Sequence, residues 1–472
     1  METKQAIAPE NNPTMVSAAY GGLSVVRLAP GDQQLTADYT LSAEAERVRA
    51  TVLTLDTPPR VVLAVEQPAA AAGSFTLAPL WNRTDYRLRM TALKNGQEIA
   101  VSANRLFRTG PIPGVVVNYI HPEDYTFNSS GRSPASPSIL RLSNGSLLVS
   151  HDIFWGGGGQ NLTHLYRSDD GGVSWYFVSE LYPCFWASLF TSKGVLYAMG
   201  TSCEYGALNL FCSTDEGVSW SKPMAILPAG SRETGGPHKG PMPVLEHEGR
   251  LWTGIDFGSW KLGGHASGAV SAAVDDDLMN AASWSCTGFT AAQPDWPDAP
   301  KGNAHGTLEG NLVAGPDGEV YNILRYQHDN CVPAYGKAVV LRMDKAHPDS
   351  QPVFHKIIDF PGNLTKFSVR FDSVTKRYYA LVNNITGSNM KQRNVLSLIS
   401  SQDMLHWTLQ RGILNYEDNN YWEDSTQVGF QYVDFTFDGE DIVLVSRSAI
   451  NGAYNYHNAN HVTVHRIRQY RL

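Results

Sequence analysis

The chain has few cysteines and little charge. Five of its 472 residues are cysteines, and no two of them form a C-x-x-C pair (Cys184, Cys203, Cys212, Cys286 and Cys331). We therefore expect neither a structural zinc site nor a disulfide framework, and mostly free, buried thiols. Charged residues make up 17% of the sequence, the net charge is -8, and like charges form no run. This balance argues against a surface for nucleic acid or for an anionic membrane.

Long apolar runs are also missing. No stretch approaches the roughly 20 apolar residues of a membrane-spanning helix. The segment Met1–Pro13 is polar and has no signal-peptide pattern. We expect residues 1–15 to be disordered. We also expect a secreted or periplasmic protein whose leader is not part of this sequence, with a cytoplasmic protein as the alternative.

Glycine and tryptophan, by contrast, are plentiful, at 42 and 11 residues, and they recur in one phrase. Ser168–Trp175 and Ser213–Trp220 both read Ser-x-Asp-x-Gly-x-x-Trp. In such a turn the Ser and Asp side chains cap backbone amides, the Gly adopts a backbone shape that other residues resist, and the Trp packs underneath. A repeated turn of this kind predicts a stacked or radial array of small β units.

Two looser copies of the turn follow. Ser401–Trp407 lacks the Gly and is one residue shorter, and Ala273–Trp284 is more degenerate. These turns resemble the Asp-boxes of the sialidase superfamily. The resemblance implies a β-propeller, in which the Asp residues of the turns are structural and lie on the outer rim, away from the active site.

The chain divides near residue 110. In residues 16–110, short alternating stretches such as Arg47–Val52 and Tyr86–Ala92 are separated by turn signals, which predicts strands. The size and pattern are typical of an immunoglobulin-like or fibronectin type III-like sandwich. Residues 110–114 form a stiff Gly-Pro linker. We interpret this domain as a spacer or as a lid over the remainder, with carbohydrate binding as the alternative.

Residues 111–472 divide into six similar units. Each unit opens with a strand, turns at a glycine or a polar residue, and continues with an apolar strand, as in Ser136–Leu140 followed by Leu147–Ser150. Six such sheets in a ring form a six-bladed β-propeller, which the terminal strand Val462–Ile467 would close. The predicted fold class is therefore all-β, a six-bladed propeller preceded by a small β-sandwich.

This division brings many polar residues to one mouth of the central channel, because the first strand of each blade lines that channel. Each residue alone could belong to a structural ion pair. Together, beside apolar strands, they predict a site for a polar, charged ligand. The candidates for catalysis are Asp152, Glu309, Tyr432, Asp434, His151 and Glu204, and those for substrate binding are Arg325, Arg370, Arg447, Lys366, His238, Gln431, Tyr205, His457 and Asn460.

The resemblance to sialidases also implies roles. Arginines clamp the carboxylate of the sugar, because the guanidinium fork matches it bidentately. The clamp candidates are Arg325, Arg370 and Arg447. A Tyr that a Glu makes basic attacks the anomeric carbon, which here implies Tyr432 with Glu309. Asp152 is the implied general acid/base.

One motif departs from the family. Sialidases open their first blade with an Arg-Ile-Pro-type motif that carries a clamp arginine, and Ala135 stands at that position here. Arg132 lies three residues earlier. In the last blade, strand alternation places Tyr432 and Asp434 on one face, which predicts a catalytic pair.

We expect an exo-acting glycoside hydrolase that removes a terminal, acidic sugar such as sialic acid from a glycan. No motif for an organic cofactor or a metal is present, and a glycan is the expected partner. Three alternatives remain. The protein could hydrolyse another sugar such as rhamnose. It could be a lyase in which His151, His238 or His457 abstracts a proton beside a uronic carboxylate. It could also be a glycan-binding propeller without activity, since fold alone does not decide function.

Overall fold

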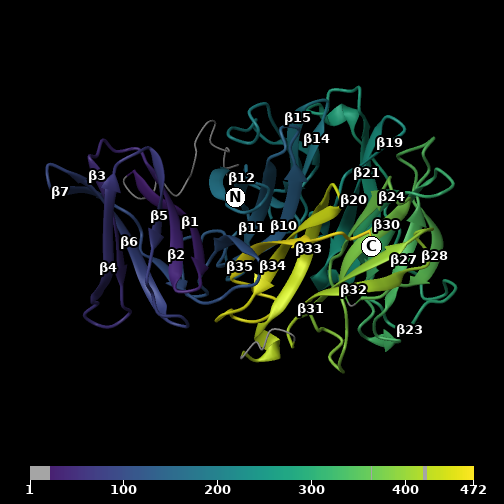
Figure 1. The fold of residues 1–472 in the computed structure, drawn as a ribbon. Coiled ribbons are helices and arrows are strands. Elements are labelled where there is room, and N and C mark those ends of the chain that lie inside the picture. Colours follow the sequence, from purple (N-terminus) through teal and green to yellow (C-terminus); the bar gives the residue numbers. More distant parts are fainter. Residues whose placement is uncertain (1–21, 363, 418–422, 472) are drawn as a thin grey trace.

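The computed structural model describes residues 22–362, 364–417 and 423–471, which form an all-β protein with two bodies (Figure 1). The disorder expected for residues 1–15 lies outside the described residues. In the described ranges, no helix is long and apolar enough to cross a membrane. Helix there is limited to single turns: η1 (Trp260–Leu262), η2 (Ala281–Ser283) and η3 (Ser425–Gln427).

The smaller body consists of two facing sheets. Its strands are β1 (Leu23–Gly31), β2 (Gln34–Leu41), β3 (Arg47–Leu53), β4 (Val61–Pro68), β5 (Ala72–Leu77), β6 (Asp85–Lys94), β7 (Gln97–Val101) and β8 (Arg105–Arg108). One sheet has the order β1-β2-β5, and the other has the order β4-β3-β6-β7 with β8 beside β6. Alternate side chains of both sheets, among them Leu35, Val48, Phe75 and Phe107, form one core between them.

The larger body is a ring of six antiparallel sheets, which we call blades 1 to 6. Blade 1 contains β10 (Ser133–Arg141), β11 (Leu147–Phe154), β12 (Leu162–Ser168) and β13 (Tyr176–Leu181). Blade 2 contains β14 (Phe185–Ser192), β15 (Val195–Thr201), β16 (Leu208–Ser213) and β17 (Met224–Leu227). Blade 3 contains β18 (Gly236–His238), β20 (Arg250–Ser259), β21 (Gly264–Ala273) and β22 (Ser285–Cys286), with β19 (Leu245–His247) beside β20.

The remaining blades complete the ring. Blade 4 contains β24 (Thr307–Ala314), β25 (Val320–Tyr326), β27 (Lys337–Arg342) and β28 (Val353–Asp359), and beside it β23 (Lys301–Gly302) pairs with β26 (Cys331–Val332). Blade 5 contains β29 (Ser368–Asp372), β30 (Arg377–Asn383), β31 (Val395–Ser401) and β32 (Thr408–Asn415). Blade 6 contains β33 (Gly429–Asp438), β34 (Asp441–Ala449), β35 (His461–Ile467) and β9 (Val115–Tyr119). The predicted all-β fold class is confirmed.

The ring is closed by a strand from the start of the propeller. The terminal segment Val462–Ile467, expected to close the ring, is most of the third strand of blade 6, and β9 pairs with it as the outermost strand. The last blade therefore combines the first and the last strands of the propeller sequence. Closure in this way leaves no open junction between blades 6 and 1.

The repeated turns share one geometry. The indole Nε1 of Trp175 donates a hydrogen bond to the carbonyl of Gly172 at 3.2 Å, and Trp220 bonds Gly217 in the same way at 3.1 Å. In the shorter copy, Trp407 bonds the carbonyl of Met404 at 2.8 Å, and Met404 adopts the left-handed backbone (φ 61°) that glycine adopts elsewhere. These turns join the third and fourth strands of their blades. They therefore lie at the opposite end of the ring from the ends of the second strands.

The smaller body packs against the side of the ring rather than over it (Figure 1). The expectation of a lid over the propeller is therefore wrong. Arg27 on β1 makes the central contact: its guanidinium donates to the carbonyls of Val117 (2.6 Å) and Val116 (3.1 Å) on β9 and pairs with Asp38 at 3.0 Å. Because β9 is the closing strand, the smaller body is tied directly to the closure of the ring.

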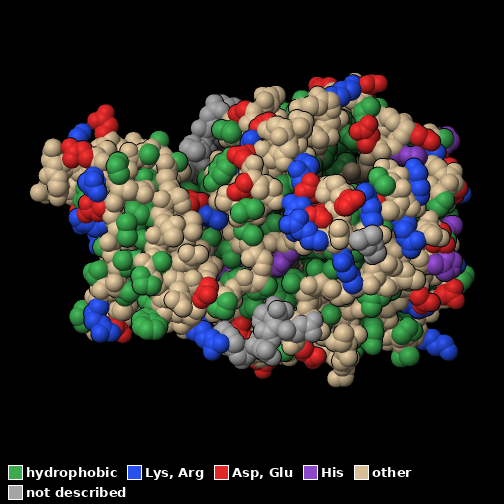
Figure 2. All heavy atoms as spheres, in the orientation of Figure 1, with side chains coloured by type: hydrophobic (Ala, Val, Ile, Leu, Met, Phe, Trp, Pro, Cys, Tyr) green, Lys and Arg blue, Asp and Glu red, His purple; other side chains and the backbone are tan. Residues whose placement is uncertain are grey.

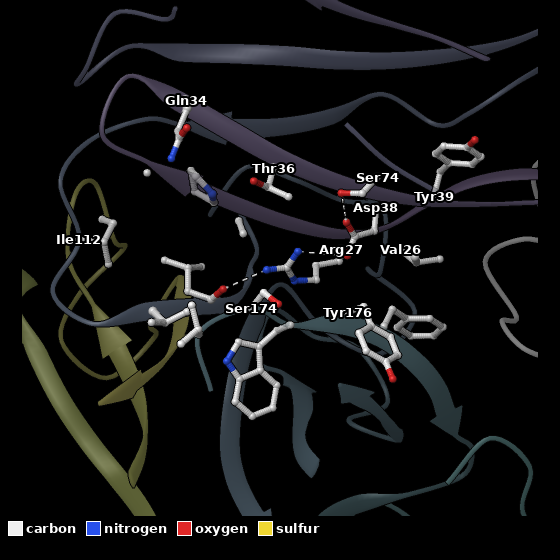
Figure 3. Close-up of a pocket in the computed structure, with 18 of the residues that line it drawn as sticks. Val26, Arg27, Gln34, Thr36, Asp38, Tyr39, Ser74, Ile112, Ser174 and Tyr176 are labelled. Carbon is white, nitrogen blue, oxygen red and sulfur yellow. Dashed lines mark hydrogen bonds and ion pairs between the residues drawn. The ribbon is translucent and has the colours of Figure 1, made fainter. Parts of the chain in front are cut away.

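A groove of about 860 Å³ runs between the two bodies. Figure 3 shows Arg27 and Asp38 crossing it, with Gln34 and Thr36 on the side of the smaller body and Tyr176 on the side of blade 1. Arg27 and Asp38 neutralise each other in this groove, and Asp38 also accepts from Ser74. We therefore interpret the groove as the seam of a structural interface.

The visible surface of the ring is charged but mixed in sign. Figure 2 shows Lys and Arg side chains interspersed with Asp and Glu on this face, and neither sign dominates it.

The first prediction concerns Arg27. We expect Arg27→Ala to lower the free energy of unfolding by about 3–5 kcal/mol, because the change leaves Asp38 buried without its cation and two carbonyls of β9 without donors. Urea unfolding followed by tryptophan fluorescence measures this. Arg60→Ala is the control, since the Arg60–Asp56 pair is exposed and its loss should not shift the midpoint. Equal midpoints for both variants would contradict the proposed importance of the seam.

Candidate active site

The first strands of four blades bulge where they enter the channel. The ladder shifts register at Ala135/Ser138, Phe185/Ser188, Leu308/Asn311 and Gln431/Asp434. Inside each bulge one residue has a left-handed backbone: Ser136 (φ 42°), Trp186 (φ 59°), Glu309 (φ 56°) and Tyr432 (φ 52°). A bulge re-aims a side chain that strand alternation would point elsewhere. Glu309 from blade 4 and Tyr432 from blade 6 thereby meet across the mouth.

The bulges are held by side chains from the preceding blade. Asp256 of blade 3 accepts a hydrogen bond from the backbone NH of Glu309 at 2.8 Å. Asn383 of blade 5 donates to the carbonyl of Phe430, two residues before Tyr432, at 2.8 Å. Asp152 of blade 1 accepts from the backbone of Trp186 in blade 2. These three polar residues lie near the ends of second strands, and each fixes the bulge of the next blade.

Asp152 therefore has a structural position. It is fully buried and accepts from the hydroxyl of Thr163 at 2.7 Å. Burial raises the pKa of Asp152 to about 8, although hydrogen bonds from Thr163 and the backbone oppose the rise. The geometry places this carboxyl between blades 1 and 2, which does not suit the general-acid role that the sequence suggested.

Tyr432, Glu309 and Arg325 form the centre of the mouth. Arg325 Nη1 lies 2.8 Å from Glu309 Oε2 and 3.4 Å from the Tyr432 hydroxyl. The hydroxyl of Tyr432 also hydrogen bonds the Glu309 carboxylate. Arg325 is held from its other side by Gln327 at 2.7 Å. The structure thus brings together the three residues that the sequence assigned to nucleophile, activating carboxylate and clamp.

Two further arginines flank Tyr432. The guanidinium of Arg447 lies 5.1 Å from the centre of the Tyr432 ring, and that of Arg393 lies 5.9 Å from it. Gln431 accepts a hydrogen bond from Arg393, and the carbonyl of His457 accepts one from Arg447. Gln431 and His457 therefore orient the arginines. Arg393 was not predicted, because it precedes the third strand of blade 5 and only first strands and the ends of second strands were considered.

The ionisation states at the centre follow from these contacts. Burial alone raises the pKa of Glu309. Other effects outweigh burial and lower this pKa: the charge and hydrogen bond of Arg325, the charge of His238 and the hydrogen bond of Tyr432. Burial and the Glu309 charge raise the pKa of Tyr432 above its usual 10, against the effect of the arginines. Glu309 is therefore a carboxylate and Tyr432 a neutral phenol near pH 7.

Positive charge is in excess at the mouth. Burial lowers the pKa of Arg447 only to about 10, so that this side chain remains protonated at neutral pH. Arg325 has Glu309 as its ionic partner, whereas Arg393 and Arg447 pair with no carboxylate in the part of the chain that the structure describes. Three guanidinium groups thus face one carboxylate, an arrangement suited to an anionic ligand.

Three predicted residues lie deeper in the channel. Asp434 accepts from Ser138 (3.2 Å), from the backbone of Ile139 (3.0 Å) and from Arg370 (3.1 Å). It thereby joins blades 1, 5 and 6. Lys366 donates to the carbonyl of Val433 at 2.7 Å, and burial lowers its pKa to about 8. The bulge after Gln431 separates Tyr432 from Asp434, so the expected Tyr432–Asp434 pair does not form. Arg370, a candidate for substrate binding, forms an ion pair with Asp434 instead.

Two others lie away from the mouth. His151 is fully buried, stacks on Tyr166 with ring centres 5.5 Å apart and contacts Asn118 at 3.0 Å; burial lowers its pKa to about 4. Asn460 bonds both the NH and the carbonyl of Ile450, which fixes a loop. In this geometry neither residue can reach a ligand beside Tyr432.

The remaining candidates form a wall opposite Tyr432. The His238 ring packs against Trp186 and His265, with ring centres 4.5 and 4.3 Å apart. The hydroxyl of Tyr205 accepts a hydrogen bond from the backbone of Trp260 at 3.2 Å, so this side chain supports the wall. Glu204 accepts from Gln160 at 3.4 Å, outside the arginine cluster. Trp186 was not predicted as a wall residue; its position at the start of a first strand was the available signal.

Aromatic side chains continue from the arginine cluster along the outer edge. The guanidinium of Arg447 lies 4.7 Å from the centre of the Phe154 ring. The next residue, Trp155, packs on Tyr454 at 4.6 Å between ring centres, and the Arg132 guanidinium lies 5.1 Å from the Trp155 ring. Arg132 therefore belongs to this edge and does not replace the arginine missing at Ala135.

Comparisons with known proteins identify the fold. No protein-family model and no curated protein matches the sequence. Among solved structures, a Hadza microbial sialidase is similar over 95% of this chain and 94% of its own, with 12% identity and a TM-score of 0.51. A leech intramolecular trans-sialidase matches 98% of this chain and 93% of its own, with 11% identity and a TM-score of 0.50.

An α-L-arabinofuranosidase from Fusarium graminearum matches 75% of this chain and 97% of its own, with 12% identity and a TM-score of 0.50. At such low identity the similarity establishes the fold alone. It confirms the propeller that the resemblance to the sialidase superfamily implied.

The second prediction tests the buried state of Asp152. Burial raises the pKa of Asp152 in the folded protein from its ordinary value of 3.8 to about 8. The stability that this carboxyl contributes is therefore present below about pH 4 and is lost as the pH rises towards 8. We expect the stability of Asp152→Asn relative to wild type to increase between pH 5 and 8. Melting temperatures across this range measure the difference, and a constant difference would contradict the assignment.

Proposed function

We propose that this protein is an exo-acting glycoside hydrolase that removes a terminal sugar bearing a carboxylate. The observation that carries the proposal is the excess of positive charge around a neutral phenol. Arg325, Arg393 and Arg447 surround Tyr432, and among the described residues only Glu309 forms an ion pair with any of them. Burying cations without partners is costly unless a ligand supplies the anion.

Each residue has a role in this reaction. The guanidinium groups bind the carboxylate of the sugar, with the planar forks fixing its orientation. Tyr432 attacks the anomeric carbon, and its phenolic proton passes to Glu309, which already accepts a hydrogen bond from this hydroxyl. A neutral nucleophile avoids the repulsion that a carboxylate nucleophile would meet beside the sugar carboxylate. Water then releases the sugar from the enzyme.

The channel below the mouth supports attack at a chain end. Lys239 donates to Thr253 at 2.9 Å, and Lys366 donates to Ser368 at 2.9 Å, so both fill the channel with bonded side chains. A Cβ at Gly240 would lie 3.3 Å from Glu309 Cγ, which shows how closely the floor approaches the centre. A ligand therefore enters from the mouth and ends there, which fits a terminal sugar.

The same charge distinguishes between the ligands named for the structural neighbours. An arabinose residue carries no charge and would leave the arginines without an anion. A sialic acid carries a carboxylate on the anomeric carbon, next to the position that Tyr432 attacks. The excess of positive charge therefore favours an acidic sugar, with sialic acid as the first substrate to test.

A release assay tests the proposal. Purified protein is incubated with chromogenic glycosides of sialic acid, glucuronic acid, rhamnose, fucose and arabinose. Release from an acidic glycoside alone is the expected outcome. Release of a neutral sugar would contradict the arginine clamp, and formation of an unsaturated uronate would indicate a lyase. Binding of glycans without turnover would indicate a binding propeller.

The third prediction concerns the nucleophile. We expect Tyr432→Phe to lower kcat by at least about a thousandfold, because losses of this size accompany removal of a nucleophile. Tyr378→Phe is a matched control. Tyr378 is also buried and loses one hydrogen bond, to the carbonyl of Ala314, but it lies outside the mouth. Steady-state kinetics on the substrate found in the release assay measure both, and a fully active Tyr432→Phe enzyme would rule out the covalent step.

The fourth prediction concerns the clamp. Arg393→Lys keeps the charge but loses the fork, so we expect kcat/KM for the acidic glycoside to fall about a hundredfold. Arg411→Lys, on the exposed strand β32, should leave it unchanged. An Arg393→Lys enzyme with wild-type kcat/KM would show that this arginine does not bind the substrate.

A further inference from the structure

The proposed hydrolysis needs a group that protonates the departing oxygen, and the carboxyls first considered are engaged elsewhere. Asp152 holds the bulge of blade 2, and Asp434 joins three blades. His457 lies beside Arg447. Burial, together with the neighbouring arginines, lowers the pKa of His457 well below its usual value, so its ring is neutral near pH 7 and is a poor acid. The acid must therefore come from another side of the mouth.

His238 occupies the opposite side. It belongs to blade 3, which in a ring of six blades lies across the channel from blade 6 and Tyr432. Asp256 Oδ2 contacts His238 Nδ1 at 3.4 Å and accepts from the backbone NH of Glu309 at 2.8 Å, so the ring lies close to the reacting centre. In a displacement at carbon, the nucleophile and the leaving group lie on opposite sides. A proton donor on blade 3 would thus face the group that leaves when Tyr432 attacks.

The ring of His238 is oriented by its neighbours. Nδ1 contacts Asp256 Oδ2 at 3.4 Å, and the ring is packed between Trp186 and His265. Asp256 is itself fixed, because Ser267 donates to its other oxygen at 2.7 Å. A carboxylate at Nδ1 sets the tautomer and orientation of an imidazole and stabilises its protonated form.

The second ring nitrogen remains available. His238 Nε2 makes no hydrogen bond with any residue that the structure describes. The atom is also not sealed from solvent. Asp256 also accepts from the backbone of Glu309 at 2.8 Å. One carboxylate therefore positions both the proposed acid and the residue that activates the nucleophile.

We propose that His238 is the general acid/base of the site, oriented by Asp256; this inference rests on the hydrolase function proposed above. As Tyr432 Oη bonds to the anomeric carbon and gives its proton to Glu309, the bond to the leaving oxygen breaks, and His238 Nε2 protonates that oxygen. In the second step water attacks the same carbon and gives a proton to neutral His238. The Tyr432–carbon bond breaks, and Glu309 returns the proton to Tyr432. Tyr432, Glu309 and the protonated His238 all end in their starting states.

The test compares leaving groups. We use His238→Asn, whose side-chain amide can keep the contact with Asp256 while removing the donor at Nε2, and His238→Gln as a second variant should the first not fold. The substrates are two glycosides of the released sugar, one with a phenolic and one with a sugar leaving group. For sialic acid these are the 4-methylumbelliferyl glycoside and sialyllactose. His347→Gln, on an exposed loop, is the control.

In the His238 variant, we expect kcat/KM for the glycoside with the sugar leaving group to fall about 100- to 10,000-fold. For the aryl glycoside we expect it to fall less than about tenfold, because a phenolate leaves without a proton. An equal loss on both substrates, or no loss on either, would overturn the role of His238 while leaving the hydrolase intact. Failure of the wild-type protein to release any sugar would instead overturn the proposed function, and this inference with it.

Discussion

The mouth of the propeller depends on bulges in the first strands of its blades. Glu309 and Tyr432 have left-handed backbones, which cost free energy for residues with side chains and persist only where the surroundings fix them. Here the neighbouring blade fixes them, through Asp256 at Glu309 and Asn383 near Tyr432. The site is therefore built between blades, and it exists only when the ring is complete.

Ring completion in turn involves the smaller body. The closing strand β9 follows directly after that body in sequence, and Arg27 binds two of its carbonyls. A second buried pair, Arg105 with Asp124 at 2.6 Å, ties the end of the smaller body to the segment that leads into blade 1. The smaller body is thus part of the scaffold that keeps blades 6 and 1 together, and these blades carry Arg447, Tyr432 and Phe154 of the mouth.

The sequence predicted the fold, and it directed attention to residues that lie together in the structure, for physical reasons. The turn motif has one geometry wherever it occurs. Tyr432, Glu309 and Arg325 occupy blade positions that the division of the sequence into six units identified.

Prediction from the sequence failed where the polarity of a residue was the only signal. Asp152 and Asp434 are carboxyls of the kind that catalysis uses, but Asp152 is buried against Thr163 of its own blade, and Asp434 joins three blades. Only these contacts reveal their roles. The pairing of Tyr432 with Asp434 assumed regular alternation, which the bulge abolishes. Arg393 was missed because the loop before β31 brings it to the mouth, and no local pattern indicates that approach.

The missing arginine at Ala135 also has a physical consequence. Ala135 is buried, and its side chain brings no charge to the blade 1 side of the mouth. Arg447 extends towards that side from blade 6, with its guanidinium over the Phe154 ring of blade 1 and bound by the His457 carbonyl. Three guanidinium groups, from blades 4, 5 and 6, therefore surround Tyr432. A ligand carboxylate bound by Arg325, Arg393 and Arg447 lies over blades 4 to 6, which leaves its other substituents directed towards Trp186 and His238 on blades 2 and 3. The positive charge on blades 4 to 6 and the aromatic wall on blades 2 and 3 are thus two parts of one proposed binding orientation.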